Sequence, residues 1–248
     1  MKTFRLIGMA VMAVLMCVNF AACSSDDEPT EEKKENIVTN EKKLIEMKEV
    51  SSDGGTGQMI FTYDSKGRLI SKKGGVTGDT NYTWGDKMIM AEDYWGVNTY
   101  TLNSKNLVEN IKESDDEPIN FTYNIDNQIV TFGDFVKYHW ENGKLIKKAI
   151  DNDYYSEELT YTYSEKTCKG YFPLYTYYYF DDDYEISLVH PELFGLRSSQ
   201  LPTQIRTKHE NGHEYIETFT YTFYDDGYIE TCTYSDDNYK TIYTFIWK

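Results

Sequence analysis

The sequence has little positive charge, few cysteines and no long hydrophobic run, and each shortage excludes a class of protein. Its 25 Lys and Arg residues are outnumbered by 41 Asp and Glu residues, which gives a formal net charge of −16. Nucleic-acid-binding proteins carry a basic surface, so we predict no nucleic-acid partner. The apolar run from Leu6 to Val18 is too short to cross a bilayer as a helix, which takes about 20 residues.

Four cysteines are present, and only Cys168 and Cys232 lie beyond residue 23. An exported chain permits a disulfide between them, but the bond requires Cα atoms within about 7 Å, which a sequence cannot establish. Both also lie in strand-like runs, where a buried free thiol is common. A disulfide and two free thiols therefore both remain open.

The N-terminus has the three zones of a secretory signal. Lys2 and Arg5 precede the apolar run, and Ala21 and Ala22 lie directly before Cys23. This ending resembles a lipobox, whose cysteine sulfur receives a diacylglyceride, although Phe20 stands where Leu is usual. We predict a signal peptide over 1–22, lipidation of Cys23 and an acyl anchor in the lipid bilayer.

Residues 23–43 are predicted to form an acidic flexible tether, because they hold many Glu and Lys and few large apolar residues. The run from Ser24 to Glu28 resembles the acidic export signal of surface lipoproteins of Bacteroidota. It favours a lipid-anchored protein on the outside of the outer membrane, with the periplasmic face as the alternative. Residues 44–248 are predicted to form one domain.

The predicted domain repeats a unit with a period near twenty. Each unit has an aromatic-polar-aromatic triplet, a turn rich in Asp, Asn and Gly, and then a basic residue followed by apolar ones. The third positions of the first six triplets are Tyr63, Trp84, Leu102, Tyr123, Trp140 and Tyr163. Twenty residues make two short strands and two turns, and Asn, Asp and Gly tolerate the positive φ of tight hairpins. We therefore predict an all-β domain of antiparallel hairpins that forms a large curved sheet, a half-barrel or a barrel-like soluble domain.

Three segments carry a family resemblance. Residues 61–69 look like tyrosine-aspartate hairpin repeats, and 190–202 and 223–229 resemble parts of an uncharacterised family of Bacteroidota lipoproteins described as porin-like β folds. That family has no established activity, so the resemblance assigns no functional residue.

Two further segments bear on the architecture. Residues 190–202 contain two prolines and a Leu-Phe-x-Leu cluster, and we expect a loop or helical turn that plugs an open end of the sheet, or a simple long connection. Tyr243, Phe245 and Trp247 alternate as in the last strand of an outer-membrane barrel. Charged residues interrupt most strands, however, which disfavours the continuous apolar band that membrane insertion requires.

Two polar motifs suggest metal chemistry. Residues 209–213 spell the His-Glu-x-x-His pattern of zinc proteases, but Asn-Gly in its middle is a strong hairpin-turn signal and the motif needs a helix. Asp151, Asp153 and Glu157 are candidate calcium ligands, although the glycine of an EF-hand loop is missing. We predict no other cofactor, and clustered acids at the other hairpin tips are interpreted as solvated turns.

Aromatic residues give the candidate ligand site. Tyr94 and Trp95 lie at an expected turn, and Tyr177, Tyr179, Asp181 and Asp183 place rings beside carboxylates. Flat rings bind the CH faces of sugars and acids bind hydroxyls, although most aromatics of such a sheet form its core. Trp84 and Trp140 occupy the repeated core position and are excluded. We predict a non-catalytic binding or scaffold module for glycan or peptide, with a carboxylate-dependent glycan hydrolase and a structural subunit of a surface complex as alternatives.

Overall fold

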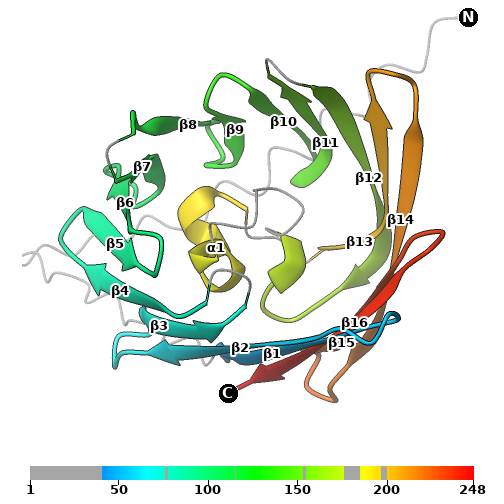
Figure 1. The fold of residues 1–248 in the computed structure, drawn as a ribbon, viewed down its shortest axis with the longest axis horizontal. Helices are drawn as coiled ribbons and strands as arrows, with labels where there is room; N and C mark the ends of the chain where they lie inside the picture. The colour runs from blue at the N-terminus through cyan, green and yellow to red at the C-terminus, as the bar shows by residue number, and fades with distance from the viewer. Residues whose placement is uncertain (1–40, 76–77, 115, 153–154, 176–184, 197–199) are drawn as a thin grey trace, which may run out of the picture. The chain divides into compact units, whose positions relative to one another are not determined.

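The computed structural model describes residues 41–75, 78–114, 116–152, 155–175, 185–196 and 200–248. Within these residues, sixteen antiparallel strands form one closed barrel, in which each strand pairs with the next along the chain and β16 returns to β1 (Figure 1). The strands are β1 (Leu44–Ser51), β2 (Thr56–Tyr63), β3 (Leu69–Gly74), β4 (Thr80–Trp84), β5 (Met88–Glu92), β6 (Val97–Leu102), β7 (Val108–Glu113), β8 (Ile119–Tyr123), β9 (Ile129–Phe132), β10 (Val136–Glu141), β11 (Lys144–Asp151), β12 (Ser156–Thr167), β13 (Gln200–His209), β14 (Glu214–Phe223), β15 (Ile229–Ser235) and β16 (Lys240–Trp247). The all-β prediction is confirmed, and the sheet closes completely.

The repeated turns follow from their side-chain chemistry. The carboxylate of Asp64 accepts the backbone N–H groups of Lys66 and Arg68, and Gly67 has a φ of 76°. The turns that begin at Asn103 and Asn124 have the same hydrogen-bond pattern and also place a residue of positive φ at their fourth position. A side chain that mimics a turn and a residue that tolerates positive φ therefore define these three hairpins.

The aromatic third positions are part of the barrel wall. Each donates a side-chain hydrogen bond to a backbone carbonyl of an adjacent unit. The pairs are Tyr63–Leu44, Trp84–Leu69, Tyr123–Val108, Trp140–Ile129 and Tyr163–Leu145, at 2.6–2.7 Å. Register shifts occur beside Tyr63, Tyr123, Trp140 and Tyr163, where a bulge twists the strand. In four of these five units, therefore, the aromatic donor fixes a bulged strand to its neighbour.

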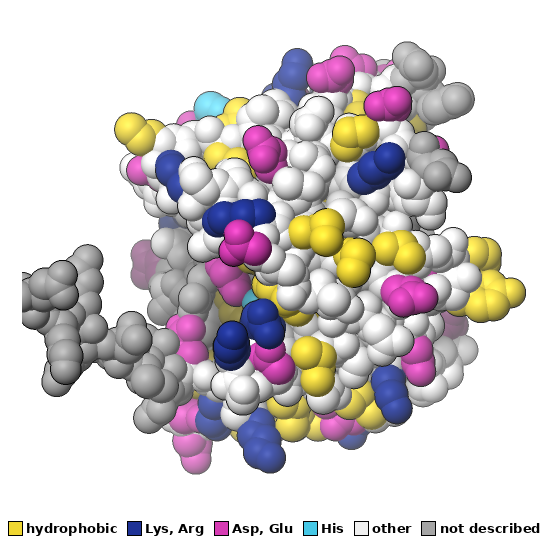
Figure 2. Space-filling model, turned by 90° about the vertical axis from the view of Figure 1, so that its left-hand side faces the viewer, with side chains coloured by type: hydrophobic (Ala, Val, Ile, Leu, Met, Phe, Trp, Pro, Cys, Tyr) yellow, Lys and Arg dark blue, Asp and Glu magenta, His cyan; other side chains and the backbone are white. Residues whose placement is uncertain are grey.

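Side chains alternate between the barrel interior and the outer wall, as they must in a strand. Phe61 and Phe121 are buried inside, whereas Thr62 and Thr122 are exposed outside. Tyr243, Phe245 and Trp247 also point inward and are at most 8% exposed, so the last strand does not present them to a bilayer. Figure 2 shows hydrophobic side chains on one side of the wall as separate groups among charged and other polar side chains. In the part of the chain described, no helix is long and apolar enough to cross a membrane.

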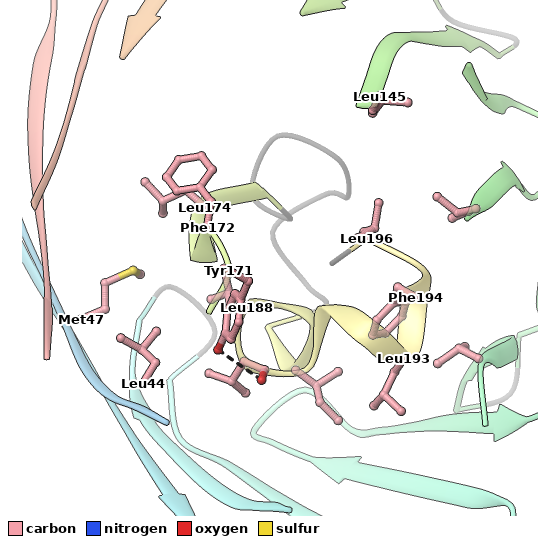
Figure 3. Close-up of a cluster of buried hydrophobic side chains, with 14 of the residues drawn as sticks. Leu44, Met47, Leu145, Tyr171, Phe172, Leu174, Leu188, Leu193, Phe194 and Leu196 are labelled. Atoms are coloured by element: carbon pink, nitrogen blue, oxygen red, sulfur yellow. Dashed lines mark hydrogen bonds between the residues drawn. The ribbon is translucent and has the colours of Figure 1, made fainter. Parts of the chain in front are cut away.

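The described residues of the connection from β12 to β13 lie inside the barrel (Figure 1). This connection contains η1 (Pro173–Tyr175), α1 (Ile186–Val189) and η2 (Pro191–Phe194). We call residues 171–175 and 185–196 the plug. Its buried apolar side chains pack with the inner wall in one hydrophobic cluster (Figure 3), whose labelled members are Leu44, Met47, Leu145, Tyr171, Phe172, Leu174, Leu188, Leu193, Phe194 and Leu196.

The structure corrects the bounds expected for this segment. The expected loop or helical turn over 190–202 exists as η2, but the plug also includes α1 and η1, which precede residue 190. Leu201 and Pro202 belong to strand β13, where Pro202 pairs with Tyr163 at a register shift. A bulge tolerates a proline because it does not require the ladder N–H.

The two ends of the barrel differ. The backbones of Lys43 and Lys248 pair with each other where the chain enters and leaves the barrel, and we call this the near end. Turns alternate between the ends, so the β12–β13 connection that carries the plug also starts and finishes at the near end. The β5–β6 and β7–β8 turns lie at the opposite, far end.

Candidate functional site

At the far end, a hollow lies beside Tyr94 and Trp95, two of the predicted ligand residues. Tyr94 and Trp95, in the β5–β6 turn, are 88% and 78% exposed, and their rings meet edge to face at 5.2 Å. A large ring normally contributes to a core, so exposure of this extent at a turn needs another explanation. The prediction that these two residues lie at a turn is confirmed.

The turn holds Trp95 in place through Asp93. The Asp93 carboxylate accepts the backbone N–H groups of Trp95 at 2.7 Å and of Gly96 at 3.1 Å, and the Asp93 N–H donates to the Gly96 carbonyl. Gly96 has a φ of 150°, and a Cβ atom there would lie 2.7 Å from the Ser114 hydroxyl. Glycine therefore lets the β5–β6 turn approach the β7–β8 hairpin closely.

The hollow between these two hairpins has a volume of about 390 Å³. Its described lining consists of Asp93, Trp95, Gly96, Val97, Asn98, Glu113, Ser114 and Asp116. Asn98 and Glu113 are register partners two positions beyond the buried pair Tyr100–Ile111, so both are on the inward-facing side of the wall. The site combines a flat apolar ring with carboxylate, amide and hydroxyl groups.

This chemistry matches a neutral polyhydroxylated ligand better than an anionic one. An exposed indole offers its face to CH groups, and carboxylates and amides accept hydrogen bonds from hydroxyl groups. A volume of a few hundred Å³ is typical of small-ligand sites. Among the described lining residues there is no Lys, Arg or His to neutralise an anion.

The sequence prediction found the ring but missed its polar neighbours. Asp116 and the adjoining residues were interpreted as an ordinary solvated turn, whereas Asp116, Ser114 and Glu113 line the hollow. The twenty-residue period could have located these neighbours, because hairpin turns that are one period apart in sequence belong to adjacent hairpins. Tyr177, Tyr179, Asp181 and Asp183, the other predicted ligand residues, lie outside the described residues, as does Cys23.

The calcium candidates are distributed over a second far-end hollow of about 410 Å³. Asp151 ends β11 and Glu157 belongs to β12; both line this hollow, and Asp153 lies outside the described residues. Glu157 lies 3.4 Å from His209. Within the described ranges, no group of three or more His, Cys, Asp or Glu residues is arranged to hold a metal ion.

The zinc-protease pattern forms a hairpin turn, as its Asn-Gly step indicated. The His209 N–H donates to the His213 carbonyl, and Gly212 has a φ of 80° between β13 and β14. His213 and His209 both pack against Tyr215. A hairpin does not provide the helical face on which that motif binds zinc.

Cys168 and Cys232 are both free and buried. Burial raises the pKa of the Cys168 thiol to about 12, and it also raises the pKa of Cys232. Trp84 and Trp140 donate to wall carbonyls, which confirms that they belong to the repeat.

Comparisons with known proteins identify the fold. No protein-family model matches the chain, and no curated protein matches its sequence. Two crystal structures of porin-like proteins have a similar fold. The protein from Bacteroides uniformis ATCC 8492 is 19% identical, with a TM-score of 0.57, over 82% of this chain and 96% of its own. The protein from Bacteroides vulgatus ATCC 8482 is 15% identical, with a TM-score of 0.62, over 83% and 98% respectively. This chain therefore has the porin-like fold that residues 190–202 and 223–229 suggested.

Proposed function

We propose that this protein is a non-catalytic, glycan-binding lipoprotein of the outer cell surface, and that the Trp95 hollow is its binding site. The observation that carries the proposal is the 78% exposure of Trp95 beside a hollow lined by Asp93, Glu113 and Asp116. Exposed aromatic rings next to carboxylates suit the apolar faces and hydroxyl groups of sugars.

The topology supports display of this site. Residue 43 enters the barrel at the near end, so a tether attached to an acylated Cys23 leaves from that end. About 20 flexible residues span on the order of 25 Å, which clears the lipid head groups. Trp95 lies at the far end, away from the point where residue 43 enters the barrel.

The outer wall supports a barrel that stands outside the bilayer. Thr62, Thr122 and Lys137 are exposed there, and apolar side chains such as Ile60 occur between polar ones. A membrane-spanning barrel presents a continuous apolar band about 25 Å high. The interior of this barrel is instead the apolar side, filled by the plug. An acyl anchor would then supply the membrane attachment.

The test is a glycan array followed by calorimetric titration of the best ligand against residues 24–248. We expect Trp95→Ala to weaken binding at least about tenfold, the effect of losing one stacked ring. Ile125→Ala is the matched control, because Ile125 is 91% exposed at a near-end turn and should leave affinity unchanged. Equal affinity of both variants would contradict the site, and sugar release abolished by replacing Asp116 or Glu113 would favour the hydrolase alternative.

The anchor has a separate test. Cys23→Ala should leave an unprocessed precursor without acyl chains, which mass spectrometry of membrane fractions detects. Protease treatment of whole cells then distinguishes the surface from the periplasmic face. Acylation of the Cys23→Ala protein would refute the assignment.

A further inference from the structure

His190 joins the plug to the barrel wall at the near end. Its ring is buried, with the residue 5% exposed, and it lies between α1 and η2. The backbone N–H of Leu69, in β3, donates to His190 Nε2 at 3.2 Å, and His190 Nδ1 lies 2.8 Å from Glu192 Oε1. One side chain thus connects two residues of the plug with a wall strand 121 positions earlier.

These contacts determine which ring nitrogen carries the proton. A backbone N–H can only donate, so Nε2 must present its lone pair to Leu69. Nδ1 therefore carries the hydrogen and donates it to the Glu192 carboxylate. The observed arrangement requires the neutral imidazole at Nε2.

Leu69 depends on this acceptor. The residue is completely buried at the register shift between β2 and β3, and its carbonyl already accepts the Trp84 indole N–H. Its N–H donates to His190. Loss of that acceptor would leave a buried donor unsatisfied, which is costly.

We propose that His190 is a pH-sensitive latch that holds the plug against the barrel wall and releases it when the ring is protonated. Protonation places a hydrogen on Nε2, which then faces the N–H of Leu69, donor against donor. The ring must turn away, and the connection between η2 and β3 is lost. Histidine is the side chain whose charge most readily changes between pH 5 and pH 8, so a comparison of two pH values in this range tests the latch.

The surrounding charges do not offer Nε2 a new partner. Glu192 contacts Nδ1, so it accepts the same hydrogen in both states. Burial alone would raise the pKa of the Glu192 carboxyl, but the hydrogen bond and charge of His190, with a smaller effect of Lys43 at the entry to β1, lower it below its ordinary value. Tyr63 and Trp84 present their rings to His190 at 6.3 and 5.5 Å, both close to edge-to-face.

One more cation borders the site. The Arg68 guanidinium lies 5.7 Å from the centre of the Trp84 ring and pairs with Asp64 at 2.7 Å. Of the charged groups described around His190, Glu192 contacts the ring directly, whereas Arg68 borders Trp84 and Lys43 acts on Glu192.

The test is hydrogen–deuterium exchange of residues 24–248 at pH 7.5 and pH 5.0, corrected for intrinsic exchange. We expect exchange in 186–196 to rise about tenfold or more at pH 5.0, the range set by loss of one buried hydrogen bond. Residues 108–113 of β7, four strands along the wall from β3, should change much less. An equal rise in both segments would indicate general destabilisation and refute a latch.

Two variants separate the latch from other histidines. His190→Gln keeps an oxygen acceptor for Leu69 but does not titrate, so its plug exchange should not respond to this pH change. His139→Gln is the control, because His139 lies on the outer wall with a side chain 65% exposed, and it should respond like the parent protein. A pH response retained by His190→Gln would overturn the proposal.

A measurement on the unmodified protein keeps the proposal testable if His190→Gln does not fold. Nitrogen-15 chemical shifts of the histidine rings report which nitrogen carries hydrogen. Protonation of His190 on Nδ1 alone at pH 7.5 supports the latch. A ring that carries hydrogen on Nε2 at pH 7.5 would refute it.

Discussion

The aromatic hydrogen bonds of the wall predict the effect of removing a single oxygen atom. The Tyr123 hydroxyl donates to the Val108 carbonyl at 2.6 Å, and Val108 is completely buried. Burial also raises the pKa of Tyr123, as expected for a hydroxyl in an apolar environment. Tyr123→Phe keeps the ring packing and removes the donor alone.

The expected cost follows from the carbonyl that is left behind. A buried polar group without its partner costs about 1–3 kcal/mol. In a domain of this size each kcal/mol lowers Tm by about 2–4 °C. We therefore expect the Tm of Tyr123→Phe to fall by at least about 2 °C, with a lower urea midpoint and an unchanged slope.

The assay is thermal and urea unfolding followed by circular dichroism. Tyr94→Phe is the matched control, because Tyr94 is 88% exposed at the far end and should keep the parent Tm. If Tyr123→Phe and Tyr94→Phe have the same Tm as the parent protein, the aromatic donors do not stabilise the wall and the physical account of the repeat is wrong.

Three further predictions concern the plug, the Glu217 carboxyl of β14 and the two free thiols. Gly195→Ala should lower Tm markedly, because Gly195 has a φ of 63° and a Cβ atom would lie 2.2 Å from the Asn127 carbonyl; an unchanged Tm would contradict this packing. Burial, with help from neighbouring carboxylates, raises the pKa of Glu217, so its contribution to stability is present below its unfolded pKa of about 4.3 and is lost as pH rises through the folded value. The change in unfolding free energy caused by Glu217→Gln should therefore be more favourable at pH 7 than at pH 4. An equal change at both pH values would contradict a raised pKa of Glu217. Cys168 and Cys232 should react with a thiol reagent only after unfolding; fast reaction of the native protein, or no thiol after unfolding, would contradict two buried free cysteines.

The hairpins could be predicted from the sequence because their causes are local. Asp64 and Gly67 define a turn within five residues, and Tyr63 and Trp84 recur at the spacing of the units. Turn chemistry and strand alternation do not depend on distant parts of the chain. The all-β class and the place of Trp84 in the repeat could therefore be derived.

Closure of the barrel could not be derived in this way. It depends on pairing between β1 and β16, with Met47 opposite Phe245, almost 200 residues apart. The same pattern of hairpins serves a curved open sheet, since only accumulated twist and stagger determine whether the edges meet. Likewise, the prolines and Leu-Phe cluster marked the plug, but its start before residue 190 depends on which side chains fit the interior.

Only the aromatic part of the binding hollow could be predicted from the sequence. Trp95 stood out as a ring at a turn, whereas Glu113 and Asp116 had the composition of any solvated tip. Their role arises from position, because Gly96 brings one hairpin within contact distance of Ser114 in the next. A site assembled from neighbouring turns requires the register between strands, which composition does not contain.

The plug places apolar side chains inside a barrel of this size. A ring of sixteen strands encloses more space than its wall side chains can fill, and large barrels of this kind otherwise hold water or a separate plug. Here the β12–β13 connection supplies Phe172, Phe194 and Leu188 to the core, and its Glu185 pairs with the buried Lys72 of β3. A buried ion pair contributes little net stability but fixes position, because either charge alone would be costly. The plug is therefore held by the Lys72–Glu185 ion pair as well as by apolar packing. Protonation of His190 can loosen the near-end attachment of the plug while this ion pair keeps the plug in position. Trp95 lies in the far-end β5–β6 turn and His190 contacts the near-end start of β3, so a ligand at that hollow and a proton at the latch would act on separate parts of the barrel.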